Sequence, residues 1–172
     1  MSTPSSQSRN EPMTPTTTLI KELARKSKSE PKRMTDALRR WTSSLGLPDT
    51  IEFNRKHKYS TLEIDIALNA QDYTCYFVAV DSQMLLTISV YIQPPIPKQK
   101  LRLVKDWILW RNQSLETGQF QLTSDENFVL YYYAVNFAGA ESIDIAVIQN
   151  MFDDVVQTLQ KNEDQIAEIL MS

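Results

Sequence analysis

The chain has 172 residues, of which 42% are hydrophobic and 23% are charged, and its formal net charge is −3. This length and composition suffice for one domain with a substantial core and an additional tail. A single cysteine and a single histidine exclude an internal disulfide, a zinc ligand set, and catalysis by Ser-His-Asp or Cys-His groups. We therefore expect that the protein binds no metal and no cofactor and is not an enzyme.

Charge is distributed unevenly along the chain. Residues 1–58 carry 12 Lys and Arg against 6 Asp and Glu, whereas residues 59–172 carry 6 against 15. A basic arm on an acidic body indicates self-contact, an anionic partner, or simply a solvated tail. Residues 1–28, rich in Ser, Thr and Pro, are expected to be disordered, and residues 29–172 are expected to form a single domain.

Two kinds of segment are not found in the sequence. No apolar run approaches the roughly 20 residues that cross a bilayer, and the N-terminal residues contain no apolar segment typical of a secretion signal. We expect a soluble, cytoplasmic protein that does not contact membranes.

The first predicted helix spans about residues 29–45, because apolar residues recur there at spacings of four, three and four. Its apolar face consists of Met34, Leu38, Trp41 and Leu45. Residues 47–58 follow as a loop with a basic cluster at residues 55–58. Because the body of the chain, residues 59–172, is acidic, a continuous track of phosphate contacts is unfavourable, and we expect no nucleic-acid partner.

Three strands are predicted between residues 59 and 92. In the first, apolar residues from Leu62 to Leu68 alternate with more polar ones, which indicates one buried face. Residues 73–80 and 84–92 are apolar on both parities, which is typical of strands covered on both faces, in mid-sheet or in an interface. Cys75 lies in such a strand and is expected to be a buried, inert thiol. The short polar turns require an antiparallel meander.

The middle helix is predicted over about residues 98–116, after a Pro-rich connector, and it carries two apolar stripes. The first consists of Leu101, Val104, Ile108 and Leu115, flanked by Trp107. Leu103 and Trp110, seven residues apart, form a second stripe on roughly the opposite side. Because a sheet covers only one side of a helix, a second copy of the chain or a partner is expected to cover the other.

A β-hairpin and a long helix complete the chain. Residues 118–123 and 128–137 read as two strands joined by a polar turn. From about residue 142 an apolar stripe persists to the C-terminus, which predicts one long helix. The fold class is therefore α+β: helix, three-stranded antiparallel meander, helix, β-hairpin and C-terminal helix.

The candidate binding residues are apolar or aromatic. They are Leu103, Trp107, Trp110, Tyr131 and Tyr133, all expected to bind a partner. The tyrosine run at residues 131–133 is most simply core and interface packing, with an aromatic small-ligand pocket as the alternative.

The segment from Trp110 to Leu130 resembles the YbjN-type domains, which share the fold of the class I type III secretion chaperones. In those domains an Asn ends the middle helix, and Gly-x-Phe-x-Leu, an acidic turn and a long strand follow. The positions that match here are Asn112, Gly118, Phe120, Leu122, Asp125, Val129 and Leu130. The resemblance covers about residues 31–170. It departs at Asn127, where many relatives have a turn glycine, and at the basic arm.

The resemblance implies a non-enzymatic protein, often dimeric, that binds extended partner segments and keeps them soluble or assists assembly. One related group in cyanobacteria assembles the carboxysome shell, and Trp107, Trp110 and the Pro-rich connector look closest to that branch.

Two hypotheses are therefore open. In the first, the chain is an assembly or escort chaperone that binds a flexible partner segment. In the second, it is a small-ligand or regulatory domain that uses the Tyr-rich sheet face. An open apolar groove or a helix interface favours the first hypothesis, and a pocket enclosed in one monomer favours the second.

Overall fold

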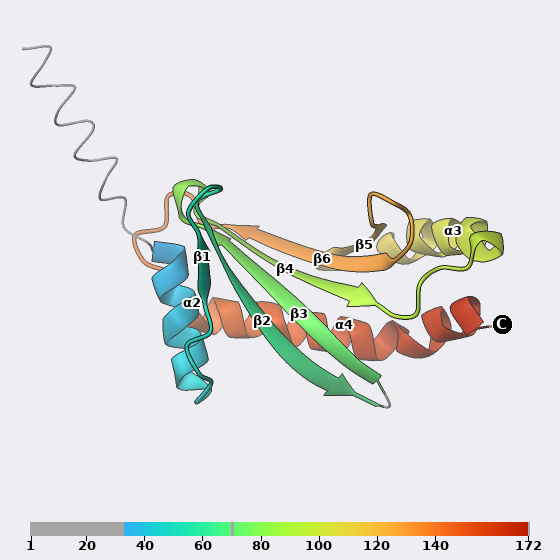
Figure 1. The fold of residues 1–172 in the computed structure, drawn as a ribbon, viewed down its shortest axis with the longest axis horizontal. Helices are drawn as coiled ribbons and strands as arrows, with labels where there is room; N and C mark the ends of the chain where they lie inside the picture. Colours follow the sequence, from blue (N-terminus) through green and yellow to red (C-terminus); the bar gives the residue numbers. More distant parts are fainter. Residues whose placement is uncertain (1–32, 70, 172) are drawn as a thin grey trace, which may run out of the picture. The chain divides into compact units, whose positions relative to one another are not determined.

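The structure is a computed structural model that describes residues 33–69 and 71–171. The predicted arm, residues 1–28, and the predicted helix start near Ser29 lie outside the described residues. Within them, the predicted α+β order is confirmed (Figure 1). The helices are α2 (Arg33–Ser44), α3 (Leu101–Asn112) and α4 (Ile145–Met171), and two short 3₁₀ turns are at Asp81–Gln83 and Lys98–Lys100.

The strands form one antiparallel sheet of six, in the order β1-β2-β3-β4-β6-β5. The predicted meander and hairpin are joined in it because β4 pairs with β6 along its whole length. The strands are β1 (Glu52–Asn54), β2 (Tyr59–Leu68), β3 (Gln71–Val80), β4 (Leu85–Ile92), β5 (Gln119–Leu122) and β6 (Val129–Asn136). The short β1 differs from the prediction that residues 47–58 form a loop.

One face of the sheet forms the core. Alternate residues of β3 and β4 on this face are buried: Tyr73, Cys75, Phe77, Ala79, Leu86, Ile88, Val90 and Ile92. Helices α2 and α4 lie against this face and against each other (Figure 1). Burial, together with the nearby carboxylate of Asp65, raises the pKa of the Cys75 thiol to about 12, so this group is a neutral core side chain at ordinary pH.

Trp41 of α2 joins this helix to β3 and α4. The side chain is 1% exposed, and its ring centroid lies 5.2 Å from that of Phe77 on β3 and 5.5 Å from that of Phe152 on α4. Its indole Nε1 donates a 2.8 Å hydrogen bond to Oε1 of Gln149, which satisfies the only polar atom of the ring.

The start of α2 is tied to the turn after β3. Asp81 Oδ1 accepts the backbone N–H groups of Met34 at 2.7 Å and Thr35 at 3.1 Å, and its Oδ2 accepts the Thr35 hydroxyl. The Thr35 and Ser60 hydroxyls are 2.8 Å apart. Because first-turn N–H groups have no partner within a helix, this carboxylate stabilises both the helix end and its docking on the sheet.

The other face of the sheet is more open. Tyr91 is 41% exposed, and its ring meets those of Tyr76 and Phe128 edge to face at centroid distances of 5.6 and 6.4 Å. The sequence predicts that β3 and β4 are covered on both faces, but α2 and α4 cover only one. Among the described residues, Tyr76 and Tyr91 on the second face contact each other and are partly exposed to solvent.

Candidate functional site

The two edges of the sheet differ in how their backbone groups are used. At the β5 edge, the side chain of Asn112 mimics a further strand: its Oδ1 accepts the N–H of Phe120 and its Nδ2 donates to the carbonyl of Phe120, both at 2.8 Å. This edge is thereby closed to a further strand at its centre. These two hydrogen bonds also give a physical reason for an Asn at the end of α3.

The β2 edge is open over most of its length. β2 has 10 residues, and β1 pairs only with Tyr59, Ser60 and Thr61. Within residues 33–69 and 71–171, no strand pairs with the outer side of residues 62–68. The stretch 62–68 is longer than the usual strand of about 5–6 residues, so a complete additional strand would fit beside it.

A groove runs beside this open edge. One cleft, of about 290 Å³, lies between β1 and β2, and a second, of about 220 Å³, lies between residues 47–50 and β2. The two clefts share Thr50, Leu62 and Glu63, so they are continuous, and we call them together the edge groove. Leu47 and the half-buried Ile64 give the edge groove an apolar lining.

The edge groove is acidic. Glu52, Glu63 and Asp65 line it and are exposed, and no described Lys or Arg lines either cleft. The nearby Arg39 is already occupied, because it donates to Asp49 at 2.9 Å and to Asp36 at 3.3 Å. The groove therefore attracts cationic side chains.

The outward side of α3 is a second apolar surface. Leu103 is 54% exposed and Trp110 is 56% exposed, so both point away from the core, as the second stripe predicts. Leu109, 68% exposed, is a further exposed apolar residue of α3, about 100° around the helix from Trp110, and was not predicted. The run of four apolar residues from Trp107 to Trp110 is the signal, since a helix on a sheet cannot bury all of them. We call Leu103, Leu109 and Trp110 the α3 surface.

Two predicted partner-binding residues are in the core instead. Trp107 is 8% exposed and packs on Phe120 at a ring distance of 4.9 Å. Tyr131 is 0% exposed, and its hydroxyl donates to the carbonyl of Thr117 at 2.9 Å. The assignment of these two side chains to a partner site is therefore wrong, because neither is accessible. Tyr133 is half-buried and lies on the helix-covered side of β6, with Tyr131.

The described residues hold no group of three His, Cys, Asp or Glu side chains that could bind a metal ion. None of the described helices combines the length and the apolar character that a membrane span needs.

Comparison with known proteins finds likeness at the level of structure only. The sequence matches no family model and no curated protein. YbjN from E. coli is 11% identical, over 76% of this chain and 91% of that chain, with a TM-score of 0.48. A chain of the HopA1–SchA chaperone–effector complex is 14% identical, over 78% and 94%, with a TM-score of 0.47.

A third similar structure is the Yersinia pestis type III secretion chaperone SycH in complex with a fragment of YscM2. It is 18% identical, over 73% of this chain and 98% of that chain, with a TM-score of 0.44. YbjN and type III secretion chaperones, which the sequence resembles, are thus found again among solved structures, as a likeness of fold.

Proposed function

We propose that the chain is a non-enzymatic protein-binding chaperone that holds an extended segment of a partner along the open edge of β2. The observation that carries this proposal is the outer side of residues 62–68, with which no described strand pairs, and the edge groove beside it. An added strand would gain affinity from main-chain hydrogen bonds and specificity from side chains placed in the groove.

The lining of the edge groove defines the partner segment. Leu47 and Ile64 favour apolar side chains, and Glu52, Glu63 and Asp65 favour Lys or Arg. Because successive side chains of a strand point to opposite faces, a segment that alternates apolar and basic residues fits best. The same acids also discourage pairing with neutral or acidic strands, which is how many proteins protect a sheet edge. A carboxysome shell client stays a prediction from the sequence resemblance.

A peptide panel tests this proposal. We expect a peptide of about ten residues that alternates Val or Ile with Lys to bind more tightly than its Glu-containing counterpart, by about tenfold or more. A proline at its centre should abolish binding, because proline lacks the N–H that strand pairing requires. Isothermal titration calorimetry on the full chain measures all three affinities.

A matched pair of variants controls for general charge effects. Glu63→Lys reverses a charge in the edge groove, and Glu168→Lys reverses an exposed charge on α4. Binding should fall for the first variant and stay unchanged for the second. Equal affinity for the Lys, Glu and proline peptides would overturn the proposal.

The α3 surface is proposed as a second interface, with a further copy of the chain or with the partner. Trp110→Ala should weaken that association by about 2 kcal/mol or more, the scale of a hot spot. Sedimentation velocity of wild type and variant, followed by partner titration, measures it. Arg102→Ala, at an exposed position of α3, is the control. If Trp110→Ala unfolded the chain, the residue would have to be core rather than interface.

A further inference from the structure

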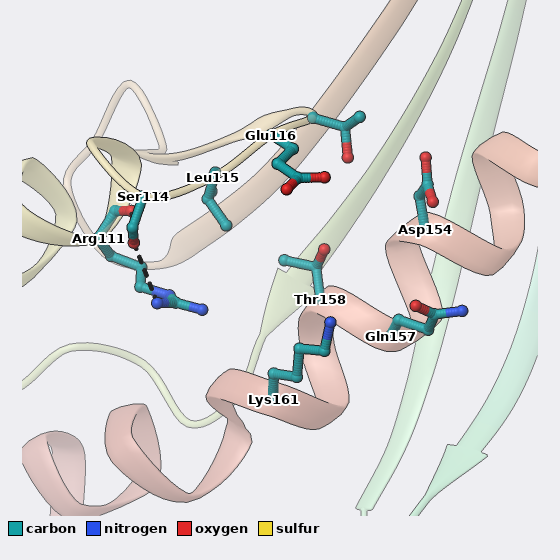
Figure 2. A pocket seen from close by; sticks show the side chains of 9 residues that line it. Arg111, Ser114, Leu115, Glu116, Asp154, Gln157, Thr158 and Lys161 are labelled. Atoms are coloured by element: carbon teal, nitrogen blue, oxygen red, sulfur yellow. Dashed lines mark hydrogen bonds between the residues drawn. The ribbon is translucent and has the colours of Figure 1, made fainter.

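A separate polar cleft lies between the end of α3 and α4, away from the edge groove. Its volume is about 200 Å³. Figure 2 shows its lining, which includes Arg111, Ser114 and Glu116 on one side and Asp154, Thr158 and Lys161 on the other. None of these residues has a role in the proposed function.

Two cations converge on this cleft. The guanidinium group of Arg111 and the ammonium group of Lys161 point into it from opposite walls (Figure 2). Ser114 holds the guanidinium in place: its hydroxyl accepts from Arg111 Nη1 at 3.1 Å and donates to the Arg111 carbonyl at 2.9 Å. Arg111 Nε is buried and has no hydrogen-bond partner among the described residues.

Neither cation forms an ion pair with a described residue. The ion pairs formed by residues 33–69 and 71–171 involve Arg39 and Lys105, not Arg111 or Lys161. Two like charges directed into one cleft repel each other. An anionic group between them would remove that repulsion and accept hydrogen bonds from the guanidinium and ammonium groups.

Two carboxylates line the same cleft. Glu116 extends from the loop after α3, and Asp154 lies on α4 about one turn before Thr158 and about two turns before Lys161, at about 3.6 residues per turn (Figure 2). Neither carboxylate is in an ion pair with a described residue. The pKa of Tyr133 is raised first by burial and then by the negative charge of Asp154, so this carboxylate lies close to β6.

We propose that this cleft binds a small zwitterion such as a free α-amino acid. Its carboxylate contacts Arg111 and Lys161, and its ammonium group contacts Glu116 and Asp154. Two positive and two negative side chains line the cleft, which favours a ligand that carries both charges. The two carboxylates would repel a phosphate or a dicarboxylate. A cleft of about 200 Å³ is large enough for a small amino acid.

The test uses the full chain and defined probes. L-serine, L-glutamine and L-arginine are the zwitterions, and acetate and methylammonium each carry one charge only. Backbone NMR shifts of residues 111–117 and 154–161 report binding at the cleft. At least one amino acid should give saturable shifts, and acetate and methylammonium should bind about tenfold more weakly, because each lacks one charge-assisted contact.

Three variants assign the binding to these residues. Lys161→Gln and Glu116→Gln remove exposed charges of opposite sign, and each should weaken amino-acid binding about tenfold. Lys98→Gln, exposed and outside the cleft lining, should leave it unchanged. Three outcomes would each overturn the proposal: saturation by none of the three amino acids, acetate binding as tight as that of the amino acids, or wild-type affinity in either the Lys161→Gln or the Glu116→Gln variant. Peptide binding at the β2 edge is measured separately, so the two proposals fail independently.

Discussion

Gly118→Ala is expected to lower the free energy of unfolding by about 3 kcal/mol. Gly118 has a φ of +62°, a conformation that is unfavourable for residues with a Cβ. An added Cβ would also press on the Tyr131 hydroxyl oxygen, at 2.6 Å from Cζ of the same ring and 3.0 Å from the carbonyl of Tyr132. The ring cannot move away, because Tyr131 is fully buried and bonded to Thr117. Chemical denaturation measures the loss.

Gly46→Ala separates the two causes of that loss. Gly46 has a similar φ of +70°, but a Cβ there meets nothing within 4 Å. This variant should lose only the conformational part, about 1 kcal/mol. Equal losses at the two positions would show that the contact with Tyr131 does not matter.

Trp41→Ala is expected to cost about 4 kcal/mol, within the range for a fully buried aromatic side chain. The substitution removes the ring that packs on Phe77 and Phe152 and leaves the Gln149 amide oxygen without its donor. The helix α2 then loses its main attachment to α4 and to the sheet. Thermal and denaturant unfolding measure the effect.

The same substitution at Trp110 is the matched control. Trp110 is 56% exposed against 1% for Trp41. Its loss should change monomer stability by no more than about 0.5 kcal/mol, as for other surface positions. Similar destabilisation by both substitutions would contradict the core described here.

Most of the fold could be predicted from periodicity, because the helices and β2 have a clear apolar spacing and the other long strands are continuous apolar runs. The alternation from Leu62 to Leu68 identified the buried side of β2, and the spacing of Met34, Leu38 and Trp41 identified the buried side of α2. The three residues of β1 are too few to show any period, so this strand was missed. The Asp81 contact with α2 joins residues 46 and 47 positions apart, which no local pattern reveals.

The candidate site was harder to predict, for reasons that particular residues make clear. β6 is apolar on both parities, so alternation alone cannot tell whether Tyr131 or Tyr132 faces the helices. Trp107 lies between the two stripes of α3, and only its contact with Phe120 decides that it is buried. The open edge of β2 depends on how short β1 is, and the polar cleft depends on packing between α3 and α4.

Hydrogen exchange of the full chain, with and without the alternating Lys peptide, tests the central claim most directly. If the peptide adds a strand to the β2 edge, backbone amides within residues 62–68 that point outward should exchange more slowly in the complex. Amides of β5, whose edge is closed by Asn112, should be unchanged. Slower exchange confined to α3 or to the face that bears Tyr76 and Tyr91, with no change in β2, would contradict the claim.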